Sequence, residues 1–154
     1  MKKRSKYRPK PVLVNPLGYV LESMKPVAHH DQYLIDLKIR NHQAMVSLLH
    51  GKATHNDFDI LIALSNVVEA LYKLGFGEGY KDVTVDGREA IIKIVNRATS
   101  IKRFTPTGLE IQALNLLMEL HDAQMDVITI KDMERALDYI ALKMRQHDAT
   151  KLPR

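Results

Sequence analysis

Three Thr-x-x-Asp/Glu motifs, each just ahead of a run of apolar residues, most constrain how this chain can fold. The pairs are Thr54 with Asp57, Thr107 with Glu110, and Thr129 with Asp132. In such a pair the threonine hydroxyl and the acid each accept a hydrogen bond from the other residue's backbone N–H, which fixes the first turn of a helix. Apolar residues then recur every three or four positions, the spacing of one helix face.

These patterns predict an all-α fold. A first helix is expected from Asp31 to His50, and a second from Thr54 until Gly75. A third is expected over 83–101, and two more follow Thr107 and Thr129. Helices of this length joined by short loops favour a compact antiparallel bundle of about five helices, preceded by an extended basic N-terminal arm.

One segment allows two interpretations. Residues 83–87, Val-Thr-Val-Asp-Gly, have the composition of a short strand entering a turn. As a helix, they place Val83 on the same face as Ala90 and Ile94. We favour the helix, in which Gly87 is a tolerated cost of about 1 kcal/mol.

The helix after Thr107 is the most apolar of the five. One seam of its surface is expected to face the core, and its members are Leu109, Ala113, Leu116, Leu120, Ala123 and Val127. Further leucines and Met118 widen this surface. A helix that is apolar around so much of its circumference is expected at the centre of a bundle.

The excess of positive over negative charge lies at the N-terminal end of the chain. The net charge is +5, but residues 1–26 carry seven Lys/Arg and one acid, whereas the remainder carries sixteen Lys/Arg and seventeen acids. Prolines at 9, 11, 16 and 26 disfavour helix there. We therefore divide the chain into an extended arm (1–26), a helical domain (27–148) and a polar C-terminal tail (149–154).

Composition also bears on location and chemistry. The chain has no cysteine, which excludes disulfides, thiol nucleophiles and cysteine-bound metals. No apolar run is long enough to span a bilayer, so a soluble protein of the cytoplasm is expected. The histidines form no HExxH motif, and no serine lies in a G-x-S-x-G turn. We expect no cofactor, no metal site and no enzymatic activity.

The basic arm is the strongest functional feature of the sequence. Its charged and aromatic residues are Lys2, Lys3, Arg4, Lys6, Tyr7, Arg8 and Lys10. The cations could neutralise phosphates while the tyrosine stacks on a base. Equally, the arm could meet an acidic protein surface or only improve solubility. The helices show no basic recognition face, so sequence-specific DNA binding is not expected.

A second candidate is an acidic stripe on the helix after Thr107. Its members are Asn115, Glu119, Asp122 and Asp126. Their spacing places them on one side of a helix, where they could face a partner. A di-metal centre is disfavoured because no other helix carries the Glu-x-x-His pair that such centres use. His121 and Asp122 are adjacent, and their side chains are expected to point too far apart to form a catalytic dyad.

Three segments resemble a group of small phage and prophage proteins of unknown function. They are KYRPKPV at 6–12, LKIRNHQAM at 37–45 and ALNLLMELHDAQMDVITIKDMERAL at 113–137. The resemblance implies a bacterial cytoplasm during infection or lysogeny. It implies no activity and no ligand.

These observations favour a non-enzymatic phage or prophage accessory protein that binds a host or defence protein, as anti-CRISPR-like inhibitors do. The alternative is a non-specific nucleic-acid-binding protein that uses the basic arm, and a metal-dependent enzyme is a distant third. A homodimer is compatible with the flat helix faces of a bundle.

Overall fold

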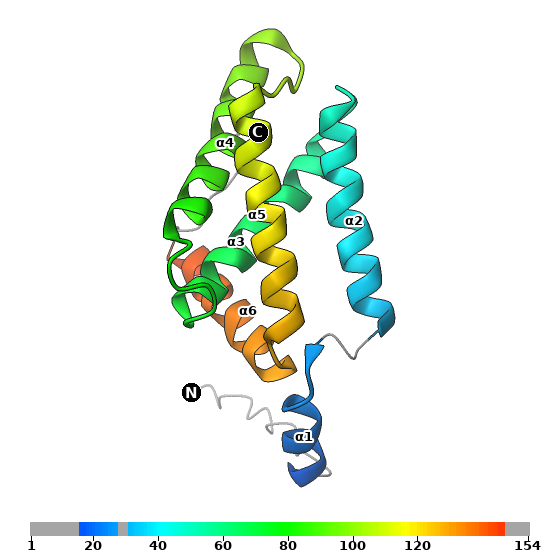
Figure 1. Ribbon diagram of the computed structural model, residues 1–154, viewed down its shortest axis with the longest axis vertical. Helices are drawn as coiled ribbons and strands as arrows, with labels where there is room; N and C mark the ends of the chain where they lie inside the picture. The colour runs from blue at the N-terminus through cyan, green and yellow to red at the C-terminus, as the bar shows by residue number, and fades with distance from the viewer. Residues whose placement is uncertain (1–15, 28–30, 147–154) are drawn as a thin grey trace, which may run out of the picture.

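The computed structural model describes residues 16–27 and 31–146, and within these ranges the chain is an all-α bundle, as the sequence predicts (Figure 1). The helices of this part of the chain are α1 (Pro16–Ser23), α2 (Asp31–Leu49), α3 (His55–Lys73), α4 (Lys81–Ile101), α5 (Gly108–Val127) and α6 (Ile130–Arg145). None of these described helices combines the length and the apolar character needed to cross a bilayer.

The three capping motifs form as predicted. At the start of α3 the Thr54 N–H donates to Asp57 Oδ2 over 2.7 Å, and the Asp57 N–H donates to Thr54 Oγ1 over 3.4 Å. The same reciprocal pair opens α5 at Thr107 and α6 at Thr129. At its other end α3 stops before Gly75, whose φ of 97° lies in the left-handed region that favours glycine.

Residues 83–87 lie inside α4, which confirms the helical interpretation. Gly87 is more than a tolerated cost, because it is buried against α5. A Cβ at this position would lie 2.8 Å from Leu117 Cδ2 and 2.9 Å from Leu117 Cβ. The absence of a side chain therefore allows α4 and α5 to pack closely along the hairpin they form in Figure 1.

The central helix is α3, and the expectation that the helix after Thr107 would be central was wrong. α3 packs against α2, α4, α5 and α6. In Figure 1 it crosses obliquely behind α5, with α4 on one side and α2 on the other. α5 packs mainly on α4 and α3.

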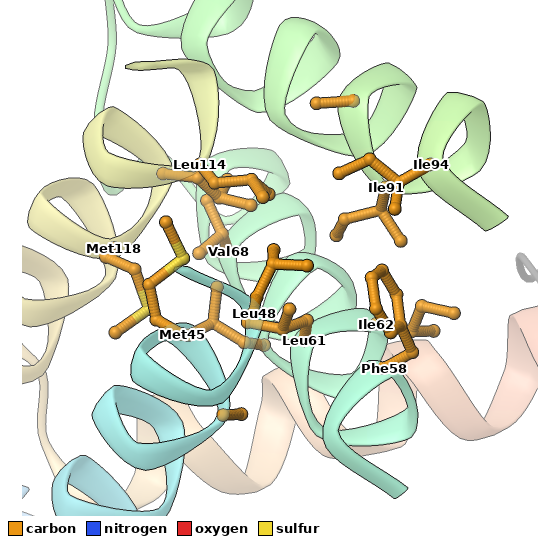
Figure 2. Close-up of a cluster of buried hydrophobic side chains, with 14 of the residues drawn as sticks. Met45, Leu48, Phe58, Leu61, Ile62, Val68, Ile91, Ile94, Leu114 and Met118 are labelled. Atoms are coloured by element: carbon orange, nitrogen blue, oxygen red, sulfur yellow. The ribbon is translucent and has the colours of Figure 1, made fainter. Parts of the chain in front are cut away.

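Two groups of buried side chains fill the bundle. The larger joins α2, α3, α4 and α5, and Figure 2 shows Met45, Phe58, Val68, Ile91 and Leu114 converging in it. The smaller lies at the other end of α3 and includes Val27, Leu71, Met125, Ile128 and Ala136.

The apolar seam predicted for α5 is largely on the wrong face. Leu109, Leu116 and Val127 are 79%, 50% and 66% exposed. The residues that α5 buries are Glu110, Leu114, Leu117, Met118, Leu120, His121, Gln124 and Met125. The buried face includes polar side chains that find partners on other elements: Gln124 Nε2 donates to Phe76 O over 2.9 Å and to Val68 O over 3.2 Å.

A charged pair braces the turn between α4 and α5. Arg97 Nη1 and Nη2 donate to the two carboxylate oxygens of Glu110 over 3.1 and 2.5 Å, and Nη2 also donates to Thr105 O over 2.7 Å. Burial opposes ionisation of Glu110, but hydrogen bonds from Arg97 and Thr107 outweigh it. The pKa of the Glu110 carboxyl is therefore below its ordinary value.

The N-terminal region differs from the extended arm expected for residues 1–26, since Pro16–Ser23 is the helix α1. Pro16 occupies its first position, where a missing N–H costs nothing and the fixed φ suits a helix. After α1 the chain pairs with the α5–α6 junction: the Val27 N–H donates to Ile128 O over 2.9 Å, and the Ile130 N–H donates to Lys25 O over 3.1 Å.

Candidate interaction sites

The basic arm predicted from the sequence, from Lys2 to Lys10, lies outside the described residues, as does the tail 149–154. Its proposed contact with nucleic acid or an acidic protein therefore stays a prediction. The described residues that follow the arm are those of α1.

The acidic stripe is divided between the fold and the solvent. His42 Nε2 lies 3.0 Å from Asp122 Oδ2, and Lys38 Nζ donates to Asp126 Oδ1 over 3.1 Å. These two contacts join α5 to α2, which otherwise packs mainly on α3. Asn115 and Glu119 are exposed. Two members of the predicted partner-facing stripe thus bind within the molecule.

Asp122 connects two imidazoles. Its other carboxylate oxygen lies 3.4 Å from Nδ1 of His121, which is 1% exposed. The expectation that these adjacent side chains would point apart was therefore wrong. The hydrogen bond with His121 lowers the pKa of Asp122, burial raises it, and the hydrogen bond with His42 lowers it again, leaving the pKa below its usual value.

Within residues 16–27 and 31–146, no three or more His, Cys, Asp or Glu side chains are grouped so that they could hold a metal ion. The contact between His42 and Asp122 links α2 to α5.

α1 and the residue that follows it present a row of apolar side chains that the packing leaves uncovered. Leu17, Val20, Leu21 and Met24 are 69%, 49%, 58% and 63% exposed. Their spacing of three, one and three residues places them on one face. α1 packs against α6 and extends from the lower end of the bundle in Figure 1. The sequence interpretation missed this face because the prolines around it favoured an extended chain.

A second exposed apolar row runs along one side of α2. It consists of Ile35, Ile39, Val46 and Leu49, each about half exposed. His42 lies on the same side of the helix, where its contact with Asp122 borders the row. Both rows show apolar surface remaining on helices at the edge of the bundle.

Comparisons with protein-family models, with curated proteins and with solved structures found no match to this chain.

Proposed function

We propose that this protein is a non-enzymatic interaction protein that docks α1 into an apolar groove on another protein. The observation that carries the proposal is the row of Leu17, Val20, Leu21 and Met24, which the bundle leaves at least about half exposed. Apolar anchors at i, i+3, i+4 and i+7 are the pattern by which one amphipathic helix binds a groove on a partner.

The energy available from this face is adequate for specific binding. Covering the exposed half of a leucine or methionine side chain contributes on the order of 1 kcal/mol. Four anchors would supply several kcal/mol, against which the cost of association must be set. Because α1 is already helical in the unbound chain, little of this energy is spent on ordering it.

The charge next to α1 defines the partner further. The segment before it carries Lys2, Lys3, Arg4, Lys6, Arg8 and Lys10. Such a segment favours a groove whose rim is acidic, because opposite charges steer association and select among partners. The partner we propose is therefore a protein with an apolar groove bordered by Asp and Glu.

The setting we propose is a bacterial cytoplasm, with the chain acting as a phage or prophage accessory protein on a host or defence component. The similarity of 6–12, 37–45 and 113–137 to small phage proteins supports this setting. An anti-CRISPR-like inhibitor is one form that such binding would take.

The test compares proteins captured from bacterial lysate by the wild-type chain and by two variants. Leu17→Ser with Leu21→Ser removes two anchors of α1, and Leu137→Ser with Leu142→Ser changes exposed leucines of α6. We expect the α1 variant to lose a specific partner by about tenfold or more, the size of an interface hot-spot effect. The α6 control is expected to retain it.

Four outcomes would contradict the proposal. One is capture of the same proteins by the wild type and the α1 variant. Another is binding of RNA or DNA that falls with salt and depends on the arm alone. A third is binding to anionic lipid vesicles that requires Leu17 and Leu21, which would make α1 a membrane-surface helix. A fourth is a concentration-dependent dimer lost in the α1 variant, which would make a second copy the occupant.

A further inference from the structure

A cavity of about 180 Å³ opens where α3, α4 and α6 meet, away from α1 and from the acidic stripe. Its charged lining comes from all three helices: Glu69 and Lys73 from α3, Arg88 from α4, and Lys143 from α6. With three cations against one acid, the cavity is positively charged, although the helical domain (27–148) carries 14 Lys/Arg against 17 Asp/Glu.

The guanidinium of Arg88 is the centre of this lining. It forms an ion pair with Glu69, and each side chain is 28% exposed. Burial lowers the pKa of Arg88, whereas the nearby Tyr139 raises it, and the net direction is downward. A single carboxylate thus compensates a largely buried cation that has two lysines beside it.

Part of the hydrogen-bonding capacity here is unused. Among the described residues, Arg88 Nε and Ser65 Oγ are buried and have no hydrogen-bond partner. Both residues border a narrow void next to the cavity. Buried polar atoms normally find a partner, so this part of the cavity wall is short of hydrogen-bond acceptors.

The cavity is small. Pockets for drug-sized ligands usually measure about 300–1,000 Å³, and 180 Å³ corresponds to about six times the volume that one water molecule occupies in the liquid. It accommodates one compact polar group. Asn66 and Tyr139 complete its wall with an amide and a hydroxyl that can donate to oxygen.

We propose that the cavity between α3, α4 and α6 binds a phosphate group, either as the free ion or as part of a small phosphate monoester. Arg88 supplies the planar guanidinium that suits phosphate oxygens. Lys73 and Lys143 add positive charge, and the hydroxyl of Tyr139 donates a hydrogen bond. The proposal is independent of the docking of α1.

The test is an NMR titration of the full chain, labelled with ¹⁵N, at constant ionic strength. The probes are inorganic phosphate, glycerol phosphate and acetate. We expect saturable amide shifts for the phosphate probes, concentrated around Asn66, Arg88 and Tyr139. Tighter binding of glycerol phosphate would identify a monoester as the ligand, and tighter binding of inorganic phosphate would identify the free ion.

Variants show whether the cavity is responsible. Lys73→Gln and Tyr139→Phe are expected to weaken phosphate binding, the former by about tenfold, because a charge-assisted hydrogen bond is lost. Lys131→Gln removes the same charge from an exposed position on α6 outside the cavity and is expected to change affinity less than about twofold. Arg88→Gln combined with Glu69→Gln removes the ion pair without leaving either charge uncompensated, and this double variant is also expected to weaken phosphate binding.

Three results would overturn the proposal. The first is the absence of a saturable shift up to about 10 mM of either phosphate probe. The second is equal weakening by Lys73→Gln and Lys131→Gln, which would indicate general attraction to a basic surface. The third is acetate binding as tightly as the phosphate probes.

Discussion

Two of the threonine-capped helix starts form hydrogen bonds with residues from another part of the chain, and these hydrogen bonds differ in kind. At the cap of Thr107, Arg97 of α4 binds the Glu110 side chain of α5 through two hydrogen bonds. The same two helices pack closely at Gly87. The segment after α1 reaches the cap at Thr129 through two backbone hydrogen bonds and the buried Val27.

The difference indicates how stability and binding capacity are distributed. The Arg97–Glu110 pair and the Gly87–Leu117 contact lie between packed helices, so changes there should affect folding. In α1 most apolar surface remains open, so changes there should affect association and leave folding almost unaltered. Four predictions test this division, beginning with the largest effect.

Replacing Arg97 by methionine should destabilise the protein most. Glu110 would keep its burial, with a side chain 10% exposed, but lose the guanidinium that compensates its charge. Breaking a fully buried pair costs about 3–5 kcal/mol. Because Arg97 itself is 35% exposed, solvent screening reduces the expected loss to about 2–3 kcal/mol. Urea denaturation measures this free energy of unfolding.

The matched control is Arg103→Met, which changes an exposed arginine of the same turn. It should lower the free energy of unfolding by less than about 0.5 kcal/mol. If Arg97→Met lowers the free energy of unfolding no more than Arg103→Met does, the Arg97–Glu110 pair contributes nothing to stability.

Gly87→Ala should lower the free energy of unfolding by about 1–2 kcal/mol. Alanine favours a helix over glycine by about 1 kcal/mol, but here its Cβ would lie within 3.0 Å of three Leu117 atoms. Overpacking of this kind costs about 1–3 kcal/mol. The double variant Gly87→Ala with Leu117→Ala should therefore lose less free energy of unfolding than the sum of the losses of the two single variants. A more stable Gly87→Ala protein would contradict the close packing of α4 and α5.

A smaller effect is expected on how the stability of the fold depends on pH, through the carboxyl group of Glu110. The pKa of Glu110 is lower in the folded chain than its unfolded value of about 4.3. Its ionisation therefore contributes stability above that pH, and the contribution is lost as the pH falls through the folded pKa. The stability difference between wild type and Glu110→Gln should narrow on acidification below about pH 4.3. Asp59→Asn, at an exposed position of α3, provides the control, and a constant difference would refute the assignment.

The smallest change in stability is expected for Leu17→Ser combined with Leu21→Ser. Both side chains are more than half exposed, so the free energy of unfolding should change by less than about 0.5 kcal/mol per site. Val27→Ala, at a buried position after α1, should cost more, about 1–2 kcal/mol. A large loss in the α1 variant would remove the distinction between the two regions.

Local patterns in the sequence predicted α2 to α6 well, but not α1. Each capping motif depends on residues three positions apart, and Thr54, Thr107 and Thr129 all cap helices where expected. The helical interpretation of 83–87 was also correct. In these cases the structure depends on interactions between neighbours in the chain.

Long-range packing explains why the predictions for α5 failed. α5 is apolar around most of its surface, so periodicity alone could not select the side that faces α3 and α4. Contacts made far along the chain select it: Leu117 with Gly87, and Gln124 with Phe76. The cavity at Arg88 combines side chains from three helices in the same way, and no local spacing reveals it.

The pairing of residues 25–27 with 128–130 gives the molecule a defined path for mechanical force. The hydrogen bonds of Val27 to Ile128 and of Ile130 to Lys25 join the root of α1 to the turn between α5 and α6. Tension applied to α1 would reach this joint before it reached the main core, and it would act on the first turn of α6 at Thr129. A molecule pulling on the N-terminal helix would therefore act first on these two hydrogen bonds, at the end of α5 and the start of α6.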